Sequence, residues 1–329
     1  MWPVIGQERI LALLDRSLAQ GGARSYLLTG PRHVGKKTLA LAMARALNCH
    51  GAQPPCEECQ ICHRISEGKH ADVVTLGLGS KTEIGIDDIR NLQHFANLPP
   101  YEGTTKVFII ESADYMSAEA SNSLLKVLEE PPPNLVWILL AVDESRLLPT
   151  IISRCLRLEL RPLSLAQIEE TLTVSYSLPH ERARLLARLS GGCIGWALSA
   201  LSDSSVLEQR TQQVEAMLSL LPADLSQRFS FARDLASQFS RERWAALDTL
   251  NVWITVWRDM MLIKGGSPEN VANLDCFPRL EQHSAHLELD QIKGAIIRLR
   301  SARQDLIKNV NARLACESLV LDLPGTDRV

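Results

Sequence analysis

The chain has 329 residues, of which 46% are hydrophobic and 22% charged, and its formal net charge is −3. This composition is typical of a globular protein of about two or three domains, and it excludes a protein drawn to nucleic acid by an overall positive charge. The sequence does not open with a basic segment followed by an apolar run, and polar residues interrupt its most apolar helical stretch. We therefore expect no signal peptide and no membrane span, and we expect the eight cysteines to be thiols or metal ligands in a reducing cytoplasm.

A glycine-rich loop at residues 30–38 follows a predicted N-terminal helix and a predicted strand at 25–29. Its sequence matches G-x-x-x-x-G-K, and an alanine-rich amphipathic helix is predicted directly after it. Strand, loop and helix in this order are typical of a P-loop, in which Gly30 and Gly35 let backbone N–H groups surround a phosphate. Lys36 would contact the β- and γ-phosphates. A chance glycine-rich turn before a helix is the alternative.

The metal-binding position of this loop is altered. The residue after the P-loop lysine is normally Ser or Thr, whose hydroxyl binds Mg²⁺, but here it is Lys37. Thr38 comes one residue later, which on a helix turns its side chain by about 100° from the required direction. We therefore expect a loop that can hold a phosphate but lacks its magnesium ligand.

Four cysteines follow the P-loop helix within one short loop. Cys56, Cys59 and Cys62 are spaced C-x-x-C-x-x-C, and a turn rich in glycine and proline can return Cys49 to them. Four thiolates suit a closed, structural Zn²⁺ site with no open position for water. A disulfide pair is the alternative, which a reducing compartment disfavours. Nearby histidines are substitute ligands, although each is more simply explained as a surface residue: His50, His63 and His70.

The following segments alternate between predicted strands and predicted helices, which indicates a parallel sheet. Helices are predicted to start at Asp87, placed as an N-cap, and at Ser117. The apolar runs predict strands at residues 72–78, 106–110, 135–142 and 156–160.

Acidic residues at the end of the 106–110 strand bear on hydrolysis. In P-loop ATPases an acidic residue here orders Mg²⁺, and in many of them a second carboxylate beside it activates water. This chain has Glu111 at the first position and Ser112 at the second, and a serine hydroxyl does not accept a proton from water near neutral pH. We therefore expect no general base. Asp114, on the outgoing turn, is expected to cap the next helix.

Four stretches together resemble bacterial clamp-loader subunits, which belong to the AAA+ ATPases. They are residues 30–36, the four cysteines, the segment ASNSLLKVLEEPP at 120–132 and the segment PTIISRC at 149–155. The resemblance covers residues 4–201, and beyond it only the helical character agrees. It implies that Arg154 of the Ser-Arg-Cys triplet is an arginine finger, which acts in trans on the ATP site of a neighbouring subunit. The alternative is a surface arginine in an ion pair.

Two classes within this family carry both the cysteines and the Ser-Arg-Cys triplet. One is the tau/gamma ATPase motor, and the other is delta-prime, a stator that does not hydrolyse ATP. Departures from the motor pattern favour the delta-prime class. Lys37 and Ser112 replace the metal ligand and the general base. The first sensor position falls on Val142 or Asp143, and the position of the motor's sensor arginine falls on Gly195.

The second half of the chain is predicted to be helical, with turn-rich residues at 266–285. Ser164 is expected to cap the first of these helices. Other helices are predicted near residues 180–189, 196–201, 287–303 and 305–321. An apolar stripe with spacings of three and four is more often core than partner site, with Trp253 beside it: Trp244, Leu247, Leu250, Ile254, Trp257 and Met261. Cationic residues make the last predicted helices locally basic. The simpler interpretation is a solvated face, and a surface near DNA is an alternative with weaker support.

The predicted fold class is α/β. It is a P-loop AAA+ domain with a parallel sheet and a zinc-binding insertion, followed by a small helical lid domain and an all-α C-terminal collar domain. The predicted domain bounds are 1–161 for the nucleotide-binding core, with its zinc module at 49–62, then 162–204 for the lid and 205–329 for the collar, which serves oligomerisation.

The resemblance implies a delta-prime-like, non-hydrolysing subunit of the DNA polymerase III clamp loader, which helps to load the sliding clamp on primed DNA during replication. Expected partners are the tau/gamma and delta subunits, the sliding clamp and, through the complex, primer–template DNA. ATP or ADP binding is left open and at most weak, Mg²⁺ is not supported, and the residues expected around the nucleotide are Gly30, Gly35, Lys36, Lys37, Thr38 and Glu111. The alternatives are a tau/gamma-like motor subunit and a stand-alone AAA+ ATP-binding protein.

Overall fold

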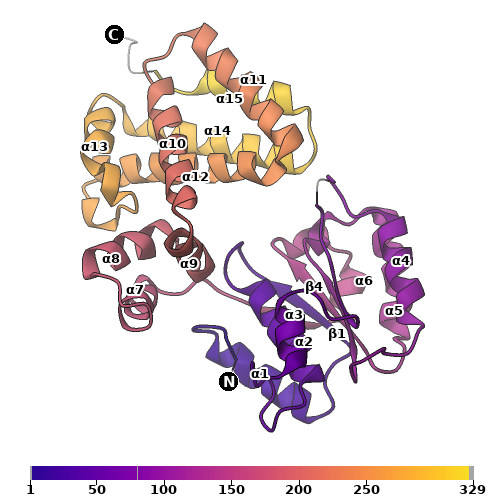
Figure 1. The fold of residues 1–329 in the computed structure, drawn as a ribbon. Helices are drawn as coiled ribbons and strands as arrows, with labels where there is room; N and C mark the ends of the chain where they lie inside the picture. The colour runs from indigo at the N-terminus through magenta and orange to yellow at the C-terminus, as the bar shows by residue number, and fades with distance from the viewer. Residues whose placement is uncertain (1, 80, 326–329) are drawn as a thin grey trace. The chain divides into compact units, whose positions relative to one another are not determined.

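The computed structural model describes residues 2–79 and 81–325. The chain divides into two compact units, of which the first is Met1–Gln167 with Gly192–Trp196 and the second is Ile168–Gly191 with Ala197–Val329. The first unit contains a parallel sheet with helices, and the second consists of helices (Figure 1). The predicted division into three domains stays a prediction.

Five strands form one sheet in the order β2-β3-β4-β1-β5, and every neighbouring pair is parallel. The strands are β1 (Ser25–Thr29), β2 (Val73–Leu76), β3 (Lys106–Ile110), β4 (Leu135–Ala141) and β5 (Leu156–Glu159). All residues of β1, β3 and β4 are buried, which is why these strands read as continuous apolar runs. The predicted α/β fold with a parallel sheet is confirmed, and β2, β4 and β5 end one or two residues earlier than predicted.

Helices cover both faces of this sheet (Figure 1). On one side lie α1 (Glu8–Ala19), α2 (Lys36–Asn48) and α3 (Gln60–Ser66), and on the other lie α4 (Ile86–Ala96) and α5 (Ala118–Glu129). Leu14, Met43 and Ile65 of the first group belong to one core cluster with Tyr26 and Ile109 of the sheet. The short helix α6 (Pro149–Ile152) packs against α5.

Two helices of the first unit start elsewhere than predicted. Helix α2 begins at Lys36, so both lysines of the P-loop lie in its first turn. Helix α4 begins at Ile86 with Gly85 as its N-cap residue, and the Asp88 carboxylate accepts the Gly85 N–H at 3.1 Å. The prediction that Asp87 is the N-cap is therefore wrong, because Asp87 lies in the first turn, where its charge still favours the helix N-terminus.

The second half of the chain contains α7 (Leu165–Val174), α8 (His180–Leu189), α9 (Ile194–Ser202), α10 (Ser204–Leu220), α11 (Leu225–Arg241), α12 (Arg243–Lys264), α13 (Phe277–Ala285), α14 (Leu289–Ile307) and α15 (Ala312–Asp322). Ser164 accepts the Gln167 N–H at 3.2 Å, as expected of a residue that starts a helix. Helix α13 was predicted as turns, but Pro278 lies in its first turn, where a missing N–H is tolerated.

Helix α12 is central to the core of the second unit, since α10, α11, α13 and α14 all pack against it. The apolar stripe is core, as predicted, but Trp253 lies in the middle of that core rather than beside it, fully buried like Trp257. Trp244, Ile254 and Met261 are only partly buried against the cluster. Within the described residues, none of the helices combines the length and the apolar character that crossing a bilayer requires.

Candidate functional site

The predicted nucleotide-site residues lie at one edge of the sheet. Since all five strands are parallel, their carboxyl ends meet at the same edge. There β1 continues into Gly30, β3 into Glu111 and β4 into Val142. Ligands of open parallel sheets bind outside this edge. The topology therefore brings together segments that are far apart in the sequence.

The glycines give the P-loop its shape. Gly30 has a φ of 136° and Gly35 a φ of 106°, values that residues with a Cβ rarely adopt. A Cβ at Gly30 would also lie 2.2 Å from the carbonyl oxygen of Leu160, so the loop packs against the end of β5 at this point. Both glycines are thus required by the conformation of the backbone.

The side chain of Lys36 folds back into the loop. Its Nζ donates hydrogen bonds of 2.7 Å to the carbonyl oxygens of Gly30 and Pro31. Burial lowers the pKa of Lys36 to about 8, although the nearby Asp114 carboxylate acts in the opposite direction. The ammonium group therefore lies where the loop would surround a phosphate, and a phosphate oxygen would have to replace the two carbonyls.

Lys37 contacts the acidic residue at the end of β3. Its Nζ lies 2.8 Å from Oε1 of Glu111, and the two side chains are 60% and 29% exposed. The side chain at the position of the usual metal-binding hydroxyl thus meets the carboxylate that orders Mg²⁺ in P-loop ATPases. Thr38 is exposed, in keeping with its place one residue late. Ser112, with a φ of 57°, turns the chain out of the strand.

Asp114 joins the ends of β3 and β4. It is buried, and its Oδ2 accepts the N–H groups of Val142 and Asp143 at 3.2 and 3.1 Å. Burial raises its pKa, against the effect of these two donors. The prediction that Asp114 caps the next helix is wrong, because Ser117 caps α5 by accepting the Ala120 N–H at 3.1 Å.

Gly195, at the start of α9, lies against the P-loop. Its N–H donates to the carbonyl oxygen of His33 at 2.9 Å, and a Cβ at this position would lie 2.6 Å from the same oxygen. The resemblance assigns the motor's sensor arginine to this position. A side chain here would have to displace the P-loop backbone, so the contact leaves room only for glycine.

The four cysteines come together as their spacing predicts. Their Sγ atoms all lie within 4.8 Å of one another, and Cys62 is buried. Backbone N–H groups donate to the sulfurs of Cys49, Cys56 and Cys59 at distances between 3.2 and 3.4 Å. Sulfurs bound at about 2.3 Å to one tetrahedral ion lie roughly 3.8 Å apart. The cluster can therefore hold a metal ion after only small adjustments.

Polar side chains beside this cluster fix the loop that leads into β3. Oδ1 of Asn48, directly before the first cysteine, accepts the N–H groups of Thr104 and Thr105 at 2.9 and 3.0 Å. Asp72 accepts three more N–H groups, from Tyr101, Glu102 and Gly103. His50 and His63 are exposed, as expected, but His70 is buried. The prediction of a surface residue is therefore wrong for His70, whose Nδ1 accepts the Asp72 N–H at 3.2 Å.

Arg154 lies on the surface of the first unit, just after α6. Its guanidinium donates to Oε1 of Glu129 at 2.5 Å and to the carbonyl oxygen of Thr150 at 2.9 Å. The side chain is 33% exposed. An arginine that acts in trans has to be accessible, and Arg154 meets this condition while it also takes part in the ion pair that was its alternative explanation.

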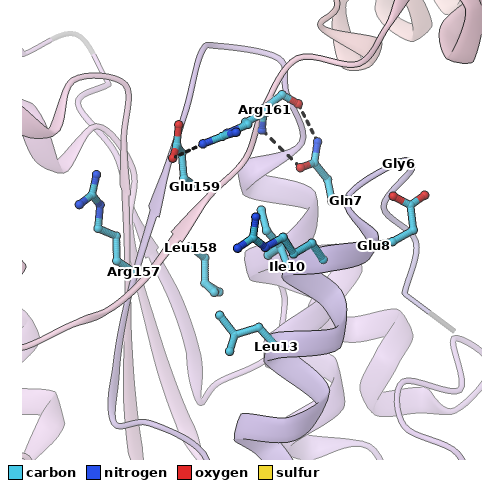
Figure 2. A pocket seen from close by; sticks show the side chains of 10 residues that line it. Gly6, Gln7, Glu8, Ile10, Leu13, Arg157, Leu158, Glu159 and Arg161 are labelled. Carbon is cyan, nitrogen blue, oxygen red and sulfur yellow. Dashed lines mark hydrogen bonds and ion pairs between the residues drawn. The ribbon is translucent and has the colours of Figure 1, made fainter.

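A pocket of about 430 Å³ lies between the start of α1 and β5 (Figure 2). Gln7 forms part of its wall, where its amide donates to the carbonyl oxygen of Arg161 at 2.7 Å and accepts the Arg161 N–H at 3.3 Å. Arg161 also pairs with Glu159 at 3.2 Å. Figure 2 shows the side chains of Leu13 and Leu158, which also line the pocket, pointing toward each other. The two hydrogen bonds of Gln7 fix the beginning of α1 to the segment that follows β5.

The sequence predicts the members of the site but not the contacts between them. Neither the pairing of Lys37 with Glu111 nor that of Gly195 with His33 has a local signal. The role of Asp72 was also missed, since a single aspartate at the start of a strand is a common feature. The pairing of Lys37 with Glu111 could have been suggested only by the presence of a lysine at the metal-ligand position in a chain that retains the carboxylate after β3.

Comparisons with known proteins agree with the motifs. The family described as "DNA polymerase III, delta subunit" matches residues 6–164. The DNA polymerase III subunit delta' of Bacillus subtilis is 31% identical over 322 residues, which cover 96% of each chain. The tau subunit of Escherichia coli is 35% identical over 233 residues, but these cover 67% of this chain and only 36% of tau. A gamma subunit-related protein of Thermotoga maritima is 20% identical, with a TM-score of 0.45 over 96% of this chain and 98% of that one.

Proposed function

The chain belongs to the family of DNA polymerase III clamp-loader subunits that includes delta-prime, tau and gamma, and from this premise we propose that it acts as the delta-prime-type subunit. In this role it is a non-hydrolysing member of the complex. It lends Arg154 to the ATP site of a neighbouring tau/gamma subunit and helps to load the sliding clamp on primed DNA in the cytoplasm.

The observation that carries this proposal is the ion pair between Lys37 and Glu111. Lys37 stands where the metal-binding hydroxyl would be, and its partner Glu111 is the carboxylate that would order Mg²⁺. Without the metal, the charge that develops on a transferring phosphoryl group is not stabilised. Ser112 in place of a general base and Gly195 in place of a sensor arginine support the same conclusion.

The extent of the similarity supports delta-prime over the motor. The alignment with the Bacillus subtilis delta' protein covers 96% of this chain, whereas the alignment with the Escherichia coli tau protein covers 67% of it. The expected partners are therefore tau/gamma and delta subunits of the same complex, and through them the clamp and primer–template DNA.

The four cysteines are proposed to hold a structural Zn²⁺ ion. Cys49, Cys56, Cys59 and Cys62 supply four sulfur ligands, which leaves no open position for a catalytic water. The ion would fix the loop between α2 and α3 and supply no chemistry to the phosphate site.

The test of this function is a reconstituted clamp loader that carries Arg154→Ala. An arginine finger contributes about 10³-fold or more to phosphoryl transfer at its site. The clamp- and DNA-dependent ATPase rate of the complex should therefore fall by the fraction of the total rate that this one site contributes. Arg157→Ala, which removes a nearby surface arginine paired with Glu144, is the matched control and should leave the rate unchanged. An unchanged rate in the Arg154→Ala complex at saturating ATP contradicts the proposal.

The isolated chain gives a second test. We expect no turnover of Mg-ATP, because the metal ligand and the general base are both replaced. Rapid hydrolysis would favour the motor subunit instead.

A further inference from the structure

We propose that the ammonium group of Lys37 takes the place of the magnesium ion at this P-loop, so that the loop binds the polyphosphate of a nucleoside diphosphate or triphosphate without a divalent cation. This inference deepens the proposed function and rests on it, since it concerns nucleotide binding at a P-loop that does not hydrolyse ATP.

The geometry places an ammonium group, paired with Glu111, between the P-loop and the end of β3. Lys37 lies in the first turn of α2, and its Nζ is 2.8 Å from Oε1 of Glu111. An ammonium group has three N–H donors, so one contact with Glu111 leaves two for other acceptors. The side chain is 60% exposed, and these donors can therefore reach a ligand at the mouth of the loop.

The surroundings of Lys37 favour an anion and disfavour a metal ion. The N-terminus of α2, a helix of 13 residues, contributes a positive field and the first-turn N–H groups, which have no partner within the helix itself. Lys36 adds a second ammonium group, whose bonds to the carbonyl oxygens of Gly30 and Pro31 a phosphate can replace. A divalent cation beside Glu111 would meet the Lys37 charge at close range, and the repulsion would cancel much of its attraction to the carboxylate.

A cation on the chain differs from a bound ion in one respect that can be measured. Affinity for a nucleotide at an ordinary P-loop depends on free Mg²⁺, because the metal bridges protein and phosphate oxygens. Here the Lys37 ammonium group, which is part of the chain, bridges protein and phosphate in place of the metal ion. Removing divalent cations should therefore leave the affinity unchanged.

The experiment is calorimetric titration of the full chain with ADP and, separately, with inorganic triphosphate, in EDTA and in excess Mg²⁺. For the wild type we expect dissociation constants for ADP that agree within about twofold between the two conditions. Binding of triphosphate as well as ADP would assign the affinity to the phosphates. For Lys37→Thr we expect at least about tenfold weaker binding in EDTA, and recovery when Mg²⁺ is added, since the hydroxyl restores a metal ligand.

Two further variants complete the design. Lys37→Met should weaken binding in both conditions, whereas Lys69→Met, which removes another exposed lysine paired with a glutamate, should change nothing. Three results overturn the inference: no binding of ADP in either condition, wild-type binding that requires Mg²⁺, or Lys37→Thr binding that is unchanged in EDTA. The Arg154→Ala assay described above involves the ATP site of another subunit, so the proposed function and this inference can fail separately.

Discussion

Gly195 donates its backbone N–H to the carbonyl oxygen of His33, at 2.9 Å, and this bond joins the start of α9 to the P-loop. The two residues are far apart in the sequence, yet they belong to the same compact unit. Because the two backbones approach so closely that a Cβ would clash, the contact depends on the absence of a side chain at position 195.

Restoring an arginine at this position should therefore damage the fold without creating an ATPase. A Cβ at Gly195 would lie 2.6 Å from the His33 oxygen, and overpacking of this kind costs about 1–3 kcal/mol. We expect Gly195→Arg and Gly195→Ala to lower the free energy of unfolding by similar amounts in chemical denaturation. Gly77→Ala is the control, because its Cβ would meet Glu111 only at 3.9 Å. Full stability of Gly195→Ala contradicts the close contact.

Asp72 should stabilise the protein in a pH-dependent way. Burial alone would raise the pKa of this carboxyl, but the N–H groups of Tyr101, Glu102 and Gly103 hold it below its ordinary value of 3.8. A carboxyl with a lowered pKa in the folded state contributes stability above its unfolded pKa, and this contribution is lost as pH falls through the folded pKa. Asp72→Asn should therefore cost about 2 kcal/mol at neutral pH, and less at about pH 3.

Urea unfolding of wild type and Asp72→Asn across this pH range measures the difference. Asp234→Asn is the matched control, because Asp234 is exposed in the middle of α11 and should contribute little at any pH. A difference between wild type and Asp72→Asn that stays constant down to about pH 3 would rule out the role of the charge.

Metal analysis tests the cysteine cluster. Under reducing conditions we expect about one zinc ion per chain, and chelation should lower the melting temperature, because binding a structural ion contributes to folding. Cys62→Ala should lose the ion and become insensitive to chelator. Cys316→Ala removes another buried thiol outside the cluster and should retain the ion. Purified wild-type protein without metal would contradict the zinc assignment.

Binding of a phosphate ligand should weaken above about pH 8. Burial lowers the pKa of Lys36 to about 8, while Asp114 and Cys193 act in the opposite direction and Arg32 adds to the lowering. Above this pH the free protein holds a neutral amine, so binding requires uptake of a proton and the affinity falls with each further pH unit. Titration with ADP between about pH 7 and pH 9, in buffers of different ionisation enthalpy, measures both effects. Lys36→Met should show weak binding without this dependence.

The sequence predicts the parallel sheet because its central strands are buried on both faces. The bounds of β1 and β3 agree with the prediction, since every residue of these strands is buried and the largely apolar run in the sequence therefore has the same length as the strand. The start of α2 was predicted three residues late, because Lys36, Lys37 and Thr38 interrupt the apolar pattern although their backbone is helical. Helix α13 was missed because a proline reads as a helix breaker unless its place in the first turn is known.

The candidate site was predicted as a set of residues rather than as a geometry. Cys49, Cys56, Cys59 and Cys62 come together because the loop that carries them is short. Lys37 and Glu111 lie on different elements, and only the order of the strands brings them together. Long-range pairs of this kind have no period or spacing that a sequence can display.

Helix α2 has a mechanical consequence for the first unit. Its first residue is Lys36 of the P-loop, and its last residue, Asn48, is anchored to the loop before β3 and precedes the first cysteine. At 13 residues it is a rod of about 20 Å, which resists bending. The helix therefore links the P-loop lysines at one end to the loop before β3 and the first cysteine at the other, although the lysines share no ligand with the cysteines.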